Sequence, residues 1–208
     1  MILIGQYDSS FVRRVGIALT LYELEFEHWP WSTFGDVEKL RDYNPLTRVP
    51  TFVLDNADVL IETFAIIDYI DGLVPTEQRL MPIVQPARHR ALWVTTLASG
   101  IADLSVRLFY ERALHHTTSD VLVSRITTQI RAALGVLEDQ CEDLVSEYWF
   151  GERIGHADIA VGASIRHMND GNPGLVDWAE YPALRRFTER LEALPVFREI
   201  SQPFIAPA

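Results

Sequence analysis

The first 75 residues alternate between short apolar runs and stretches with helical periodicity. Residues 12–22 and the segment that begins at Glu62 place apolar side chains every three or four positions, which predicts two helices. Between them, residues 31–43 are mixed and leave room for one more helix. Short runs rich in Val, Ile and Phe predict four strands, at residues 2–7, 25–29, 51–54 and 59–61. In chain order this gives β-α-β-α-β-β-α.

The second half of the chain shows only helical periodicity. Residues 75–86 carry three prolines among polar side chains, which predicts a linker between a domain at 1–78 and a second at 86–208. The segment 155–168 is apolar nearly all round and is therefore expected to be a buried central helix. Helices are predicted at 87–115, from 119 to about 141, at 155–168 and at 182–194. The fold class is thus a small α/β domain followed by an all-helical domain.

Charge and composition narrow the possible partners. The 208 residues carry a formal net charge of −11, which disfavours nucleic acid and anionic membrane surfaces. No apolar run approaches the roughly 20 residues of a membrane span. The chain starts with Met1 and a strand-like Ile-Leu-Ile run, so a signal peptide is not expected and a cytoplasmic location is. With Cys141 as the single cysteine, neither an internal disulfide nor a Cys metal cluster is expected.

Two neighbouring hydroxyl groups precede the first predicted helix. Ser9 and Ser10 can cap that helix, or they can stabilise an anion at its N-terminus. Neither serine lies in a Gly-x-Ser-x-Gly turn, so a Ser-His-Asp hydrolase is not expected.

Two further segments can form an anion cradle. Val49-Pro50 opens the third strand, where the proline is either trans or a cis bond that turns the backbone tightly. Glu62-Thr63 opens a helix, whose free N–H groups attract negative charge. Read with the serines, these segments predict a site for a short peptide-like anion.

Four segments, in the same order, resemble the cytosolic glutathione transferases. Residues 9–15 (Ser-Ser-Phe-Val-Arg-Arg-Val) are similar to the family's Ser-Pro-Phe-Val-Arg-Lys-Val, and residues 44–50 (Asn-Pro-Leu-Thr-Arg-Val-Pro) to Asn-Pro-Leu-Gly-Lys-Val-Pro. Residues 62–70 resemble Glu-Ser-x-Ala-Ile-x-x-Tyr-Ile, and residues 155–158 resemble the buried-helix cap Ser/Thr-x-x-Asp. The likeness is closest to the serine-type bacterial members.

The resemblance implies a glutathione transferase fold, in which a thioredoxin-like N-terminal domain precedes an all-helical C-terminal domain. It also implies a cytoplasmic homodimer that uses glutathione as co-substrate, without a permanently bound cofactor, against a small hydrophobic electrophile in detoxification. Ser9 would stabilise the glutathione thiolate, with Ser10 next and Tyr7 a weaker candidate. The implied glutathione-binding residues are Phe11, Arg48, Val49, Pro50, Glu62 and Thr63.

The resemblance says less about the second substrate. The acceptor pocket is expected between the domains, lined by Arg107, Tyr110 and Glu111 and closed on the near side by Trp31 and Phe34. These side chains can equally be helix-surface or dimer contacts. A non-catalytic or regulatory glutathione-binding protein remains an alternative, as does a glutathione-dependent isomerase, dehalogenase or peroxidase. His156 and His167 lack metal-ligand spacing, so no metal is expected.

Three departures from the family pattern carry structural expectations. Thr47 replaces a Gly, so its loop is expected to avoid a backbone conformation that requires Gly. Thr63 replaces the commoner Ser but keeps the hydroxyl. Gly155 replaces the capping Ser or Thr, which costs only a few tenths of a kcal/mol.

Overall fold

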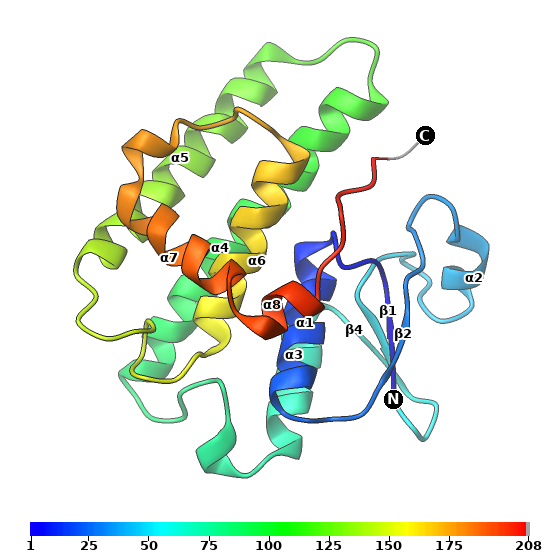
Figure 1. Cartoon of the computed structure of the whole chain (residues 1–208). Coiled ribbons are helices and arrows are strands. Elements are labelled where there is room, and N and C mark those ends of the chain that lie inside the picture. The colour runs from blue at the N-terminus through cyan, green and yellow to red at the C-terminus, as the bar shows by residue number, and fades with distance from the viewer. Residues whose placement is uncertain (207–208) are drawn as a thin grey trace.

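The N-terminal part of the molecule is a small sheet with helices packed on it. The computed structural model describes residues 1–206. The element order β-α-β-α-β-β-α confirms the predicted order (Figure 1). The elements are β1 (Ile2–Ile4), α1 (Ser10–Leu21), β2 (Glu27–Trp29), α2 (Val37–Arg41), β3 (Thr51–Val53), β4 (Val59–Ile61) and α3 (Thr63–Leu73).

The four strands form one mixed sheet in the order β2-β1-β3-β4. β1 pairs in parallel with β2 and antiparallel with β3, so Leu3 lies opposite both His28 and Phe52. The first strand ends at Ile4, three residues earlier than predicted, because Gly5 turns the chain at φ 132°. A Cβ atom at Gly5 would lie 2.5–3.0 Å from the side chains of Val12 and Val49. The missing side chain therefore allows the end of β1, helix α1 and the loop before β3 to pack closely.

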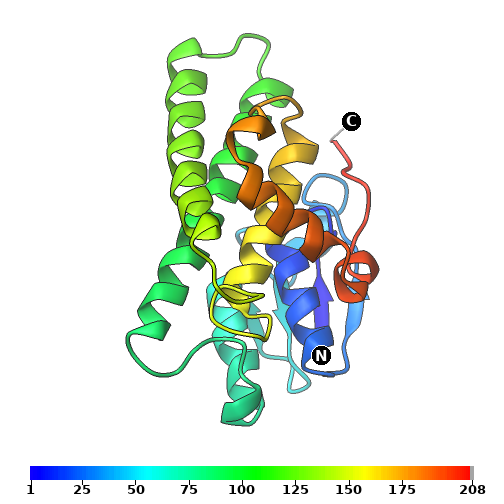
Figure 2. The same ribbon diagram turned by 60° about the vertical axis from the view of Figure 1, so that its left-hand side comes forward.

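The C-terminal part is helical throughout. The helix predicted at 182–194 is α7, which ends two residues earlier, at Glu192. A further short helix, α8, was not predicted and has Pro195 in its first turn. Figures 1 and 2 show α1 and α3 lying between the sheet and this domain. Its elements are the 3-10 turn Thr76–Gln78, α4 (Ala87–Leu114), α5 (Asp120–Glu142), α6 (His156–Gly171), the 3-10 turn Trp178–Glu180, α7 (Pro182–Glu192) and α8 (Pro195–Glu199).

α4 is the long helix of this domain. By length and composition it could cross a membrane, contrary to the expectation that no apolar run is long enough. Its apolar side chains are used within the fold, however, since Val94, Ala98, Ile101 and Leu108 are buried and the helix packs on α5 and α6. Its apolar character is therefore explained by core packing.

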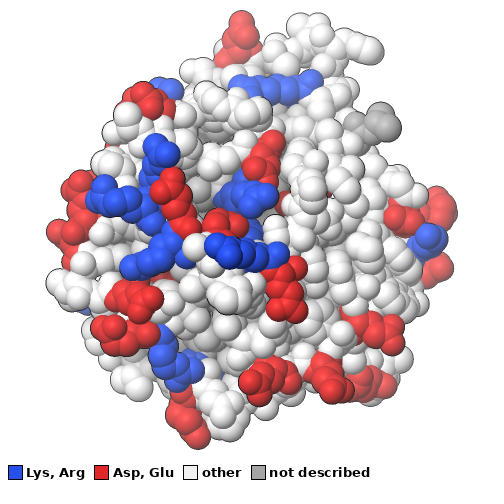
Figure 3. Space-filling model, in the orientation of Figure 1, with Lys and Arg blue, Asp and Glu red and all other residues white. Residues whose placement is uncertain are grey.

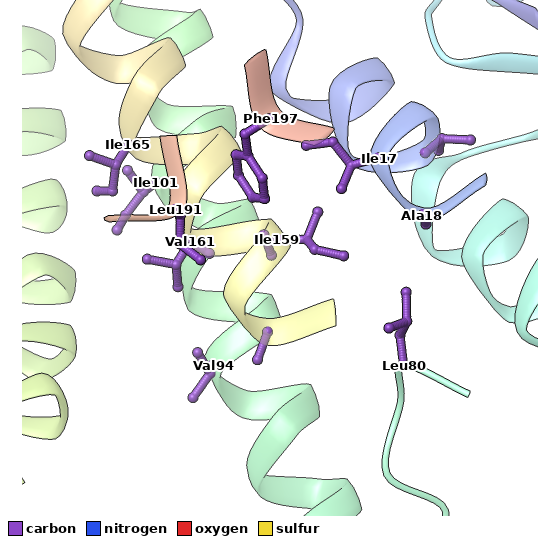
Figure 4. Close-up of a cluster of buried hydrophobic side chains, with 14 of the residues drawn as sticks. Ile17, Ala18, Leu80, Val94, Ile101, Ile159, Val161, Ile165, Leu191 and Phe197 are labelled. Atoms are coloured by element: carbon purple, nitrogen blue, oxygen red, sulfur yellow. The ribbon is translucent and has the colours of Figure 1, made fainter. Parts of the chain in front are cut away.

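One continuous core joins the two domains. Figure 4 shows Ile17 and Ala18 of α1 facing Ile159 of α6, with Phe197 of α8 beside them. All four side chains are fully buried. The helical domain therefore packs directly on α1, the helix that follows the predicted thiolate site.

The structure at the start of α6 explains why Gly155 stands where a capping Ser or Thr is usual. Asp158 accepts hydrogen bonds from the backbone N–H groups of Gly155 (2.7 Å) and Trp149 (2.9 Å). A Cβ at Gly155 would lie 2.9 Å from the Leu80 carbonyl oxygen, so the usual capping Ser or Thr does not fit without a shift. Burial raises the pKa of Asp158 to about 6.

A buried polar cluster also crosses the domain boundary. Asp71 of α3 accepts a hydrogen bond from the Tyr22 hydroxyl and lies 2.9 Å from Nε2 of His156 at the start of α6. The Tyr22 oxygen in turn accepts from the Leu80 N–H at 2.8 Å. Burial opposes ionisation of Asp71, but its bonds to His156 and Tyr22 outweigh burial and hold its pKa below the usual value.

The surface over the helical domain mixes both charges. Figure 3 shows Arg side chains interleaved there with Asp and Glu. The ion pairs Arg166–Asp170 and Arg185–Glu189 belong to this region. The face drawn is therefore not a uniform basic surface of the kind that binds phosphate backbones.

Candidate active site

A cavity of about 790 Å³ lies between the sheet domain and α4. It brings together most of the residues proposed from the sequence, although they come from segments up to 100 positions apart. From the predicted glutathione site these are Ser9, Phe11, Arg48, Val49, Pro50, Glu62 and Thr63, and from the predicted acceptor pocket Trp31, Phe34, Arg107 and Tyr110.

The two serines differ in position. Ser9 is the N-cap residue of α1, lines the cavity and makes no side-chain capping bond to the helix. Ser10 is 1% exposed, is not part of the cavity lining, and its hydroxyl has no partner among the described residues. The weaker candidate Tyr7 stacks on His28 outside the lining, and burial raises its pKa to about 12. Of these three candidates, only Ser9 lines the cavity.

The loop before β3 supplies the second part of the site. The Val49–Pro50 bond is cis, which is one of the two forms that the sequence left open. The buried Asn44 side chain donates to the Arg48 carbonyl (2.9 Å) and to the Thr51 hydroxyl (3.0 Å), which holds the loop in shape. Arg48 itself is exposed and lines the cavity.

The expectation for Thr47 was wrong. Its φ is +48°, so it adopts the left-handed conformation that Gly would favour. The Thr47 N–H donates to the Asn44 carbonyl at 2.8 Å, and the Asn44 bonds on either side fix the turn. The hydrogen bonds of the loop thus prevail over the preference of a β-branched residue.

The start of α3 supplies the third part. Glu62 has φ +75° and ψ +124°, an unusual conformation for a residue with a side chain. Its carboxylate accepts from the Thr63 N–H at 2.9 Å. The Thr63 hydroxyl is buried without a partner among the described residues. The turn therefore places a carboxylate and an unpartnered hydroxyl in the cavity lining, beside the remaining N–H groups of the first turn of α3.

The structure adds charged residues that the sequence did not single out. Arg14 is 1% exposed and donates from Nη1 to Ser99 Oγ at 2.7 Å, a bond between two lining residues that links α1 to α4. Burial lowers the pKa of Arg14 to about 10. Burial and the charge of Glu62 raise the pKa of the cavity carboxyl Asp103. Helical periodicity predicts such positions as buried or exposed, but it does not show that they face a ligand.

The acceptor end needs one correction. Glu111 does not line the cavity, because its carboxylate accepts from the Ser119 N–H at 2.7 Å and lies 2.9 Å from Nδ1 of His115. Arg107 and Tyr110 do line it. Tyr110 meets Phe34 edge to face, with ring centroids 5.6 Å apart.

The end of the chain was not predicted as part of the site. Phe204 and Ile205 line the cavity after the chain has crossed α1 from α8. Asp8, next to Ser9, accepts from the Ile205 N–H at 3.0 Å. No periodicity marks this short segment, so the sequence alone offered no signal. Within residues 1–206 no group of three or more His, Cys, Asp or Glu side chains is arranged to hold a metal ion.

Comparisons with known proteins identify the fold and the family. A model of the glutathione S-transferase N-terminal domain matches residues 3–78, and a model of the C-terminal domain matches residues 120–190. The chain belongs to the glutathione S-transferase family. This confirms the predicted family and fold. A probable maleylacetoacetate isomerase of Caenorhabditis elegans is 29% identical, over 94% of this chain and 90% of its own length.

Solved members of the family share the whole architecture. A glutathione S-transferase from Methylobacterium radiotolerans, in complex with glutathione sulfonate, has a TM-score of 0.88 at 25% identity and covers 100% of this chain and 98% of its own. A family member from Pseudomonas fluorescens with bound glutathione has a TM-score of 0.85 at 26% identity, covering 98% and 99%. Both domains of this chain therefore follow the family's arrangement.

Proposed function

We propose that the cavity binds glutathione and that Ser9 stabilises its thiolate for attack on an electrophile. The observation that carries this proposal is the Ser9 hydroxyl, which lines the cavity at the start of α1 and is not used as a helix cap. A hydroxyl that donates to sulfur, beside the positive end of a helix dipole, favours the thiolate over the thiol. Each unit by which the thiol pKa falls corresponds to about 1.36 kcal/mol.

The rest of the glutathione half accounts for the other parts of the tripeptide. The backbone of Val49 would pair in strand fashion with the cysteinyl unit. The Thr63 hydroxyl and the N–H groups of α3 would bind the γ-glutamyl carboxylate, since anions favour helix N-termini. Glu62 would accept from the γ-glutamyl ammonium, and Arg48 would approach the other carboxylate.

Two measurements test this proposal. Titration calorimetry should detect glutathione binding, and ultraviolet absorbance of the bound thiolate should appear at lower pH than in free glutathione. Absence of binding would reject the proposal. Binding with an unshifted thiol, and no turnover against a panel of electrophiles, hydroperoxides and disulfides, would favour a non-catalytic or regulatory protein instead.

A glutathione-dependent isomerase is the second candidate. It is supported by the similarity to a probable maleylacetoacetate isomerase and by Arg107, a cation at the acceptor end that suits a carboxylate substrate. The same thiolate would add to the substrate double bond and leave after rotation, so the first half of the site is unchanged. Incubation with maleylacetoacetate and catalytic glutathione, followed by absorbance, distinguishes isomerisation from stable conjugation.

We also propose that the protein forms a homodimer. Tyr69 and Leu73 of α3 and Trp93 of α4 are large apolar side chains with 37%, 46% and 56% exposure. If these side chains form one contiguous apolar patch, that patch would be typical of a protein interface. Light scattering after size exclusion should give twice the mass of 23.7 kDa.

A further inference from the structure

The last described residues of the chain form a wall of the acceptor end of the cavity. Phe204, Ile205 and Ala206 line it together with Phe109 and Tyr110 of α4. Figures 1 and 2 show this segment leaving α8, crossing α1 and running along the gap between the helical domain and the sheet domain. It therefore adds side chains to a cleft that is otherwise built mainly by residues of the sheet domain and α4.

The segment is held in place at several points. Upstream, Arg13 of α1 donates to the carbonyls of Phe197 (2.7 Å) and Ile200 (2.8 Å). Gln202 then accepts from the Tyr7 N–H at 2.9 Å. Further along, the Ile205 N–H donates to the Asp8 carboxylate at 3.0 Å. Both of the latter bonds end on the loop that carries Ser9, so the wall is fixed relative to the proposed thiolate.

Phe204 completes a chain of aromatic rings. Its ring centroid lies 5.1 Å from that of Phe109, at an interplanar angle of 86°, and 5.7 Å from that of His167. Phe109 continues to Tyr110 at 5.9 Å, and Tyr110 to Phe34 at 5.6 Å. Rings from the sheet domain, α4, α6 and the chain end thus follow one side of the cavity.

We propose that Phe204 is a specificity-determining residue that selects acceptors with a flat ring over acceptors with an alkyl chain. Edge-to-face and offset contacts give one ring an advantage over an alkyl group of equal area. An acceptor held between glutathione sulfur and this wall would gain that contact, whereas an alkyl group would gain burial alone. The inference rests on the proposed glutathione site, whose sulfur end lies at Ser9.

Binding of S-substituted glutathiones tests this without requiring turnover. Calorimetry should compare S-benzylglutathione and S-butylglutathione on the wild-type protein, Phe204→Leu and Phe204→Tyr. Phe204→Leu keeps an apolar side chain but removes the flat face, so it should weaken S-benzylglutathione about ten-fold. S-butylglutathione should change less than about two-fold, and Phe204→Tyr should keep the preference for the ring.

Phe150→Leu is the matched control. Phe150 is also half-buried and packs on the core, but it does not line the cavity, so its substitution should leave both affinities unchanged. Equal weakening of both ligands in Phe204→Leu, or no weakening, would overturn the inference while the glutathione site stands. Failure of glutathione itself to bind the wild type would overturn the proposed function and this inference with it.

Discussion

The two ends of the cavity are built by different means. The proposed glutathione end is built from short contiguous segments and depends mainly on their backbone conformation. These are the cis Val49–Pro50 turn and the unusual conformation of Glu62 at the start of α3. The acceptor end uses side-chain rings from four separate parts of the chain. Backbone geometry suits an invariant ligand, whereas side chains on a common frame can change and thereby alter what is accepted.

The largest effect should follow substitution of Ser9. If its hydroxyl donates to the thiolate, Ser9→Ala should lower kcat about 100-fold, in line with hydrogen bonds to charged groups, while the Kd for glutathione changes about two-fold. Steady-state kinetics and calorimetry measure the two quantities. Ser10→Ala is the control, because its buried hydroxyl is outside the cavity lining. Equal losses in both variants would contradict the different roles of the two serines.

The next effect separates the two ends of the cavity. Thr63→Val keeps the shape of the side chain but removes the hydroxyl, so the Kd for glutathione should rise about ten-fold. Thr33→Val makes the same change at the acceptor end of the lining and should leave that Kd unaltered. Calorimetry measures the Kd for glutathione in both variants. A loss in Thr33→Val as large as that in Thr63→Val would mean that glutathione extends over the whole cavity.

Acid should weaken glutathione binding through Asp103. Burial and Glu62 raise the pKa of this carboxyl, so it takes up a proton at higher pH than an ordinary aspartate as the solution is acidified from neutrality. The cavity then loses negative charge that attracts the γ-glutamyl ammonium, and the affinity should fall about five-fold. Asp103→Asn should bind more weakly at neutral pH and show a flatter profile. An unchanged profile would assign the pH dependence to another group.

A smaller effect is expected for Arg107, which is exposed and therefore screened by solvent. Arg107→Gln should weaken S-(2-carboxyethyl)glutathione about three-fold relative to S-propylglutathione, and added salt should reduce the difference. Arg112→Gln, one turn further along α4 and paired with Asn172, is the control. If both substitutions act alike, the effect is general electrostatics and not contact with the acceptor.

The smallest effect concerns stability alone. Thr47→Gly relieves a β-branched side chain of its left-handed conformation, and the gain exceeds the extra entropy of Gly in the unfolded chain. The free energy of unfolding should rise by about 1 kcal/mol, measured with urea, and glutathione affinity should not change. Thr47→Val keeps the strain and should not stabilise. A stabilised Thr47→Val would place the cause outside the backbone.

The two ends of the cavity also differ in how far their residues could be predicted from the sequence. Val49-Pro50 comes just before β3 and Glu62-Thr63 just after β4, the two strands of a predicted hairpin. Their joint presence in one site could therefore be predicted from local pattern, as could the order of strands and helices. The presence of Arg14 and Phe204 in the cavity lining could not be predicted. Neither the periodicity of a helix nor the sequence of a short tail shows which distant segment it packs against. Their proximity to the cavity is a product of tertiary packing.

The two wrong expectations about the site have a similar origin. Arg107 and Glu111 are four positions apart and share a helix face, but the chain folds back after α4 and Ser119 takes the Glu111 carboxylate. Thr47 was expected to avoid the Gly conformation, but the bonds of Asn44 impose it. In each case a hydrogen bond made by the surrounding loop outweighed a rule that considers one residue or one helix.

The cluster of Tyr22, Asp71 and His156 affects what happens when the chain is cut between its two domains. A cut in the linker would leave Tyr22 and Asp71 on one fragment and the imidazole of His156 on the other. Each fragment would also expose half of a shared apolar surface, so we expect neither to fold alone and the two to reassemble only when mixed. Split-protein sensors built on this chain would therefore report association at that seam.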